Sequence, residues 1–114
     1  MNSVNLIGRL VRDPEIRSTA SDSRVAVLRL AVRRQRGGES DGAVFIDVVC
    51  FGRLAEIVAE HLRKGRRVSV EGRLDHRDWI GTNGEPRGRH EIVARRIGFL
   101  DRPSPRADVP DSGA

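Results

Sequence analysis

Four aromatic side chains and an excess of arginine are the features of this sequence that could do chemistry. The aromatics are Phe45, Phe51, Trp79 and Phe99, and Lys64 is the only lysine among the 21 basic residues. Arginine binds phosphate through paired hydrogen bonds and stacks on flat rings, while aromatic rings can stack on any base. The formal net charge of +5 favours a polyanionic partner. A GC-rich genome that favours arginine codons would give the same composition.

Signals for catalysis are weak. The sequence contains no nucleophile elbow, zinc-protease motif, phosphate-binding glycine loop or paired-cysteine spacing. Asp47, Glu71 and Asp75 could in principle gather around a metal ion, as in a nuclease, but their spacing does not favour a metal site over surface salt bridges. The sequence therefore predicts a protein without enzymatic activity, cofactor or metal.

Length and composition predict one soluble domain. The chain has 114 residues, 38% hydrophobic and 32% charged, which is typical of a globular domain. It contains no apolar run of membrane-spanning length and no basic and apolar signal segment at the start. Cys50 is alone and cannot form an internal disulfide, which is typical of a reducing compartment. We expect a cytoplasmic protein without a membrane partner.

Five apolar runs separated by turn signals predict β-strands, and one run with helical spacing predicts a helix. The predicted strands are residues 4–11, 24–32, 43–51, 68–77 and 89–100, and the predicted helix is residues 52–64. Gly8 predicts a bend inside the first strand, and Gly65 predicts the left-handed end of the helix. Residues 33–42 predict a long exposed hairpin loop, and Asn83-Gly84 predicts a tight hairpin turn.

This order predicts an all-β fold: a five-stranded oligonucleotide/oligosaccharide-binding (OB) barrel with one helix between strands three and four. In such barrels, bends at glycines close the sheet, and the open face with its loops holds the ligand. Some other small antiparallel barrel stays open as an alternative. We expect one domain over residues 1–100 and a disordered tail over residues 101–114, where three prolines occur in fourteen residues.

Alternation in the third predicted strand divides its residues between two faces. Val44, Ile46, Val48 and Cys50 form the set that suits a barrel interior, and the other set contains Phe45, Asp47, Val49 and Phe51. Two aromatics and an acid suit an outer, ligand-binding face. The alternative for the two phenylalanines is packing against the helix or a partner subunit.

Trp79 lies at the end of the fourth predicted strand beside a Gly- and Asn-rich hairpin, where a core position is difficult. We expect it to be a stacking residue, with a cross-strand hairpin contact as the alternative. Phe99 lies in the C-terminal apolar run and is expected to close the barrel or an interface. The candidate phosphate-binding arginines surround this aromatic face: Arg33, Arg34, Arg36, Arg73, Arg77, Arg87 and Arg89.

Three motifs together resemble those of bacterial single-stranded DNA-binding proteins. They are NSVNLIGRLVRDPEIR at residues 2–17, FGRLAE at residues 51–56 and LRKGRRVSVEGRL at residues 62–74. With the hairpin around Trp79, the resemblance covers about residues 1–100 in order and spacing. It implies an OB barrel that assembles as a homotetramer, in which Phe45, Phe51 and Trp79 stack on bases.

The resemblance implies sequence-independent binding and protection of single-stranded DNA in replication, recombination, repair or DNA uptake, in the nucleoid. An assembly adaptor whose aromatics contact another protein is the alternative. Two departures matter. Residues 33–36 have no aromatic, so we expect more electrostatic binding. Residues 108–114 lack an acidic tip, so recruitment of other replication proteins is doubtful, as in an accessory paralogue or a shortened chain.

Overall fold

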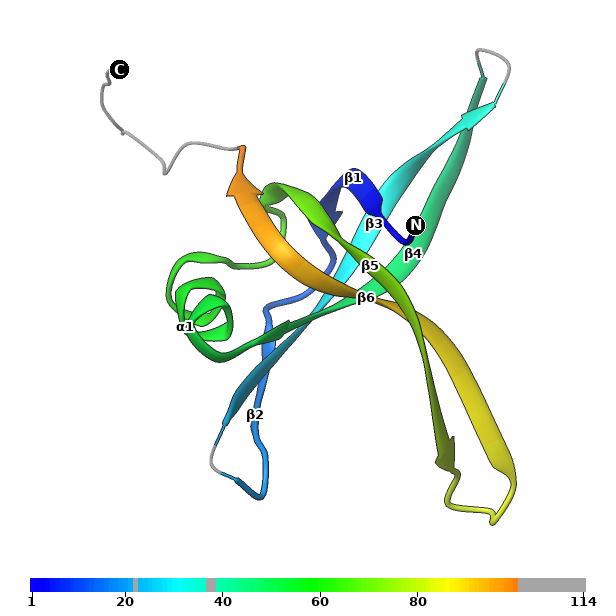
Figure 1. Cartoon of the computed structure of the whole chain (residues 1–114). Helices are drawn as coiled ribbons and strands as arrows, with labels where there is room; N and C mark the ends of the chain where they lie inside the picture. Colours follow the sequence, from blue (N-terminus) through cyan, green and yellow to red (C-terminus); the bar gives the residue numbers. More distant parts are fainter. Residues whose placement is uncertain (22, 37–38, 101–114) are drawn as a thin grey trace.

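The chain folds into six strands and one helix in a computed structural model that describes residues 1–21, 23–36 and 39–100 (Figure 1). The elements are β1 (Val4–Leu10), β2 (Glu15–Ser18), β3 (Arg24–Arg36), β4 (Glu39–Phe51), α1 (Gly52–His61), β5 (Arg67–Ile80) and β6 (Pro86–Phe99). No described helix has the length and apolarity needed to cross a membrane. The predicted tail over residues 101–114 lies outside the described residues.

Five of the strands close a barrel. The sheet order is β1-β5-β6-β4-β3-β2, and β1 also pairs with β3, so β2 is left as an addition at the edge of β3. The β4–β6 pair is parallel, and the other pairs are antiparallel. The helix follows the third barrel strand, as predicted, and the barrel is the expected OB fold.

Strand β2 was not predicted, because nothing in its local sequence marks it. Its four residues are all exposed, so it lacks the alternation between apolar and polar residues that identifies a half-buried strand. Pairing with β3 defines it instead, through a register that sets Ile16 opposite Ala26 and Ser18 opposite Arg24.

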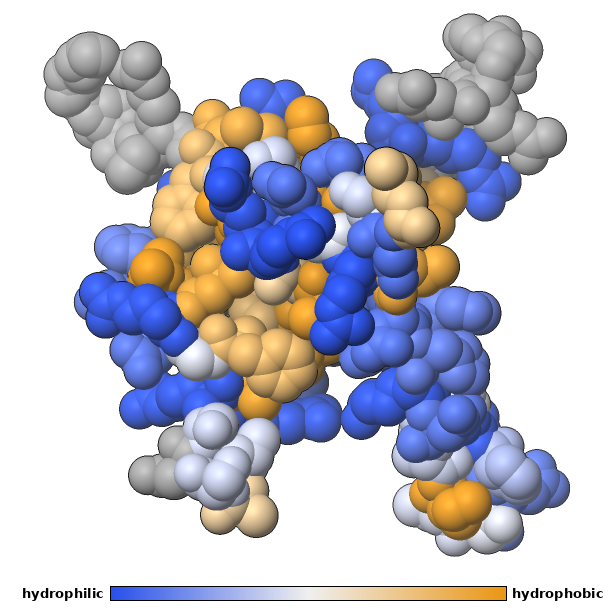
Figure 2. Space-filling view, in the orientation of Figure 1, coloured by the Kyte–Doolittle hydropathy of each residue, from blue (hydrophilic) through white to orange (hydrophobic). Residues whose placement is uncertain are grey.

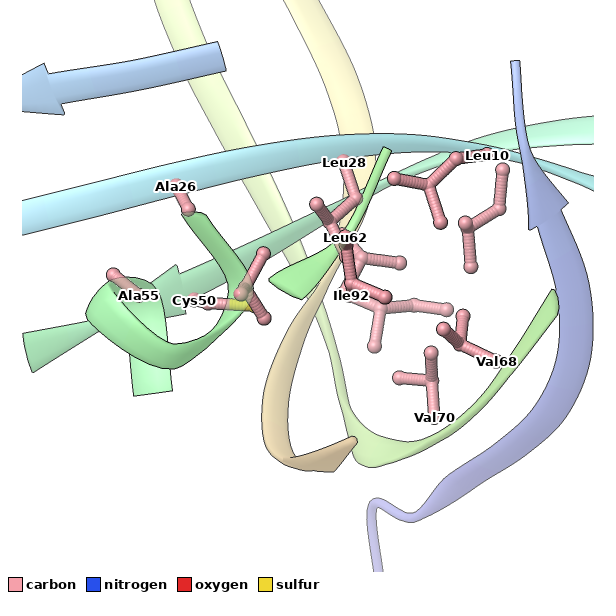
Figure 3. Close-up of a cluster of buried hydrophobic side chains, with 12 residues drawn as sticks. Leu10, Ala26, Leu28, Cys50, Ala55, Leu62, Val68, Val70 and Ile92 are labelled. Atoms are coloured by element: carbon pink, nitrogen blue, oxygen red, sulfur yellow. The ribbon is translucent and has the colours of Figure 1, made fainter. Parts of the chain in front are cut away.

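The barrel core comes from alternate residues of the strands, closed on one side by α1. Leu28 on β3 and Val48 on β4 are fully buried and directly opposite each other. Val58 of α1 and Leu62 just beyond it are buried in the same cluster (Figure 3). Burying each such side chain contributes about 1.5–3 kcal/mol relative to leaving it exposed.

Helix α1 begins at Gly52, as predicted, but ends at His61 and not at residue 64. The backbone of Leu62 is already extended, and this geometry brings its side chain into the core, where it is fully buried. Gly65 is left-handed with φ +90°, but it does not end the helix. Its N–H donates instead to the Leu10 carbonyl at 2.8 Å. Burial of Leu62 therefore overrides the local helix signal.

Two long β-ribbons project from the barrel (Figure 1). The predicted loop over residues 33–42 is wrong in large part, because β3 continues to Arg36 and β4 begins at Glu39. Backbone pairing extends these strands into a stretch whose sequence has no alternating apolar pattern. The second hairpin has the predicted turn: Gly84 is left-handed, and the Gly81 N–H donates to the Glu85 carbonyl at 2.8 Å.

The thiol of Cys50 is fully buried on the inner face of β4. This burial raises the pKa of the thiol to about 12, because the low-dielectric core disfavours the thiolate. Since the thiolate is the reactive form, we expect no modification of the native protein by a thiol reagent at pH 8 and one modified site after addition of denaturant. Mass spectrometry of both samples measures this, and rapid native labelling would contradict the burial.

Candidate nucleic-acid interface

The strand register places alternate residues of four strands on one continuous outer face. Phe45 on β4 lies opposite Ala31 on β3, and Asp47 lies between Arg29 on β3 and Glu91 on β6. Directly opposite residues point to the same side of a sheet. The pairing continues onto β5, so we define the basic–aromatic face as Arg29, Arg33, Phe45, Asp47, Phe51, Arg73, Asp75, Arg77, Trp79, Arg87, Arg89 and Glu91.

The three predicted stacking aromatics all lie on this face. Phe45 and Phe51 are about half exposed, at 52% and 51%, which is unusual for large apolar side chains that pack in a core. Trp79 is half-buried on the β5–β6 ribbon. Phe99 lies elsewhere: it is 39% exposed, and its ring centroid is 5.9 Å from that of His61.

Arginines lie against two of the aromatics. The guanidinium carbon of Arg77 is 5.0 Å from the centroid of the Trp79 ring, and that of Arg29 is 5.7 Å from the Phe45 ring. Both distances fall within the range of cation–π attraction. Each of these two aromatics therefore has a positive charge beside it. A base that stacks on either ring would bring its phosphate near an arginine.

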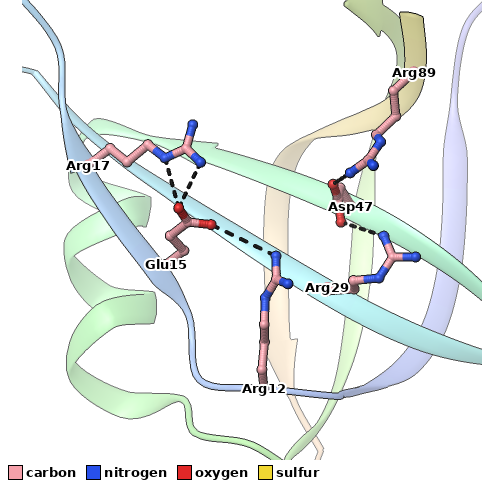
Figure 4. Close-up of polar contacts among 6 residues, drawn as sticks. All are labelled: Arg12, Glu15, Arg17, Arg29, Asp47 and Arg89. Carbon is pink, nitrogen blue, oxygen red and sulfur yellow. Dashed lines mark hydrogen bonds and ion pairs between the residues drawn. The ribbon is translucent and has the colours of Figure 1, made fainter. Parts of the chain in front are cut away.

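Asp47 lies at the centre of the face and binds two arginines at once (Figure 4). Its Oδ1 accepts a hydrogen bond from Arg29 at 3.0 Å, and its Oδ2 accepts one from Arg89 at 2.7 Å. Burial by itself raises the pKa of this carboxyl. The hydrogen bonds and charges of Arg89 and Arg29 outweigh that effect and hold the pKa below its ordinary value. Asp47 is therefore ionised at neutral pH.

Other carboxylates of the face are also paired with arginines. Glu91 is 8% exposed, and its Oε1 is 3.6 Å from the Nε of Arg77. Asp75 is 3.7 Å from the nearest guanidinium nitrogen of Arg73. Glu71, which lies farther along β5, has an arginine partner in Arg96 at 3.8 Å.

These pairings bear on the possible metal site of Asp47, Glu71 and Asp75. Each carboxylate has its own arginine partner, and an arginine at that distance competes with a cation for the carboxylate oxygens. Within the described residues, no three His, Cys, Asp or Glu side chains are placed to hold a metal ion.

The predicted arginines divide into two groups. The structure brings together Arg33, Arg73, Arg77, Arg87 and Arg89 on the same face as the three aromatics. Arg34 falls at the register shift between Arg33 and Gln35 and has an exposed side chain. The side chain of Arg36 lies outside the described part of the chain. Figure 2 shows the β5–β6 ribbon, at its lower right, as mainly hydrophilic.

Sequence reasoning missed Arg29 and Glu91. Arg29 is the one charged residue between residues 25 and 32. Its odd-numbered position could have placed it on the outer face of β3, since the even-numbered apolar residues form the buried face. Its register with Asp47 was not predictable, because a shift in the β3–β4 ribbon separates the hairpin turn from this pair. Glu91 becomes visible only through the parallel pairing of β4 with β6.

A closed five-stranded barrel with this basic–aromatic face defines an OB-fold protein. The sequence matches the single-strand binding protein family over residues 1–100, and the chain belongs to that family.

Three relatives carry the name single-stranded DNA-binding protein. The one from Wolinella succinogenes is 38% identical over 104 residues, covering 88% of this chain and 64% of the relative. The one from Helicobacter hepaticus is 42% identical, covering 88% and 61%, and the one from Thermotoga maritima is 43% identical, covering 89% and 74%. This chain thus spans less than two thirds of the length of the first two.

Proposed function

We propose that this chain binds single-stranded DNA without sequence preference and protects it during replication, recombination, repair or uptake, without catalysing a reaction. One observation carries the proposal: three exposed or half-exposed aromatics share a face with at least six arginines. Aromatic stacking accepts any base, and arginines bind phosphates irrespective of sequence. The names of the relatives support the same ligand.

The binding path that we propose crosses β3, β4, β6 and β5 and continues along both ribbons. Phe45 and Phe51 stand on the barrel, and Trp79 stands on the β5–β6 ribbon. A single strand that contacts all three must therefore cross the barrel face and continue onto the β5–β6 ribbon. Arg33 lies on one ribbon and Arg87 on the other, so both ribbons can hold phosphates beyond the aromatics.

A titration with a fluorescence readout tests the proposal. Trp79 is the only tryptophan, so quenching of its emission by poly-dT reports a base that stacks at this site. We expect tight, salt-dependent quenching by the single strand and weak binding of a duplex of equal length. The oligonucleotide should stay intact in magnesium. Absence of binding at low salt would overturn the proposal and favour a protein partner for the aromatic face.

An Arg33→Gln, Arg34→Gln double variant is expected to flatten the dependence of log K on log salt. Each phosphate that an arginine neutralises on a single strand contributes a slope of about −0.7, so the slope should change by roughly that amount for each phosphate that the variant no longer binds. Anisotropy of a labelled poly-dT oligonucleotide over a salt series measures it. An unchanged slope would place the β3–β4 ribbon away from the DNA.

Self-association is part of the proposal, with a homotetramer as the expected form. Ile7 is 55% exposed on β1, and Phe99 and Leu100 are 39% and 38% exposed at the end of β6. Exposed apolar side chains of this size are typical of interfaces when they cluster. Light scattering coupled to gel filtration should give four times the 12.6 kDa of one chain, and a monomeric mass would exclude this assembly.

A further inference from the structure

Two buried carboxylates lie side by side at the centre of the basic–aromatic face. Asp47 and Glu91 are directly opposite each other in the parallel β4–β6 pair, and they are 6% and 8% exposed. Within the described residues, they are the two charged side chains that the fold buries. Negative charge at the centre of a surface that binds phosphates opposes binding electrostatically, so these carboxylates need another explanation.

Each carboxylate holds an arginine that lies over an aromatic ring. Asp47 bonds Arg29 at 3.0 Å, and Arg29 lies 5.7 Å from the Phe45 centroid. On the neighbouring strands, Glu91 contacts the arginine that lies over Trp79, with an N–O distance of 3.6 Å. The same spatial arrangement therefore occurs twice on one face: a carboxylate contacts an arginine, and that arginine lies over an aromatic ring. Asp47 also bonds Arg89 at 2.7 Å and so fixes a second arginine.

We infer that Asp47, supported by Glu91, is a positioning residue of the DNA site: it fixes arginines beside the stacking aromatics in the free protein. This inference rests on the proposed function. A guanidinium has five N–H donors, and each arginine gives one to Asp47. Four donors on each remain for a phosphate. The side chains of Arg29 and Arg89 are 32% and 49% exposed, so both are partly open to solvent.

Arginine side chains that are already fixed in the free protein explain how the negative charge of Asp47 can strengthen the binding of an anion. A free arginine side chain samples many rotamers, and binding must overcome that entropy for each arginine that becomes fixed. Asp47 fixes two of them in advance, from β3 and β6, across β4. Loss of Asp47 should therefore cost affinity, although the face becomes more positive by one charge.

Asp47→Asn tests the inference, with Asp75→Asn as its matched control. Both variants remove one negative charge from the same row of side chains, which runs from Asp75 through Glu91 to Asp47. Asp75 has a half-exposed side chain and one arginine partner at 3.7 Å. We expect Asp47→Asn to weaken poly-dT binding about tenfold, because two arginines are no longer ordered in advance. Asp75→Asn should tighten binding slightly at low salt.

The salt dependence separates positioning from charge. If arginines no longer reach their phosphates, the slope of log K against log salt becomes shallower in Asp47→Asn by about 0.7 for each phosphate. If charge alone matters, both variants bind more tightly with steeper slopes, and that result would overturn the inference. Wild-type binding of the single strand in the same series keeps this outcome distinct from failure of the proposed function.

A second set of variants keeps the test valid if Asp47→Asn folds poorly, which a thermal melt would show. Arg29→Gln and Glu91→Gln each remove one member of the repeated arrangement. We expect Glu91→Gln to weaken binding and to change the Trp79 emission of the free protein. In a double-mutant cycle, Arg29→Gln should add little to the loss of affinity in Asp47→Asn. Additive losses would show that Arg29 acts independently of Asp47 and would contradict the inference.

Discussion

A Trp79→Ala variant is expected to bind poly-dT and poly-dA about tenfold more weakly than the wild-type chain, with a similar loss for both. One base stacked on an aromatic contributes about 1–3 kcal/mol, and the flat face of the ring accepts purines and pyrimidines alike. Arg77 lies 5.0 Å from the ring centroid, so truncation also removes the surface against which this arginine packs. Anisotropy of labelled oligonucleotides measures the loss, because the intrinsic fluorophore is removed.

Ile80→Ala is the matched control for this variant. Ile80 is the next residue along β5, is 67% exposed, and faces the opposite side of the ribbon. Its truncation removes exposed apolar surface from the same ribbon without touching the basic–aromatic face, so affinity should change little. A loss confined to one oligonucleotide sequence would contradict a stacking role for Trp79. An equal loss in both variants would indicate that the ribbon was perturbed as a whole.

Alternation along the sequence of β4 predicted the aromatic face, because successive residues of a strand point to opposite sides of the sheet. Phe45 and Phe51 share a parity on β4 and are exposed, while Val48 and Cys50 share the other and are fully buried. The prediction was wrong for Val44, which was expected inside but is 45% exposed, and for Val49, which was expected outside but is 6% exposed. Asp47 also has the parity of the phenylalanines but is 6% exposed. Arginines from β3 and β6 cover it, and only the pairing of β4 with both of these strands brings them there.

The elements that sequence reasoning missed depend on tertiary pairing. The exposed strand β2 has no buried side and so no alternating pattern. The outer part of β3 has no apolar residue after Val32 that could form such a pattern. The end of α1 follows from the burial of Leu62 and not from the glycine three residues later. Turn chemistry was predictable where one conformation requires glycine, as at Gly84 with φ +80°.

A Gly72→Ala variant is expected to lose about 1–3 kcal/mol of unfolding free energy, the usual cost of overpacking a well-packed site. The β5–β6 register shifts here: Glu71 lies opposite Arg96 and Gly72 lies opposite Ala94. The extra residue of this bulge is Arg95 on β6, and a bulge bends the strand that carries it. The bulge lies between the barrel part of the β5–β6 pair and the ribbon that carries Trp79. A Cβ at Gly72 would collide with the Val93 carbonyl oxygen. Thermal melting followed by circular dichroism measures the loss.

Gly81→Ala is the control, because a Cβ there meets mainly flexible side-chain atoms of Asn83 and Arg87, at 3.1 Å and 3.3 Å. These contacts are much looser than the backbone overlap at Gly72, so this variant should melt close to the wild-type temperature. Equal stability of Gly72→Ala and the wild-type chain would show that β5 has room for a side chain at the bulge. If Gly72→Ala folds but binds poly-dT more weakly than Gly81→Ala, the bend also directs Trp79 toward the DNA, and the glycine serves both fold and site.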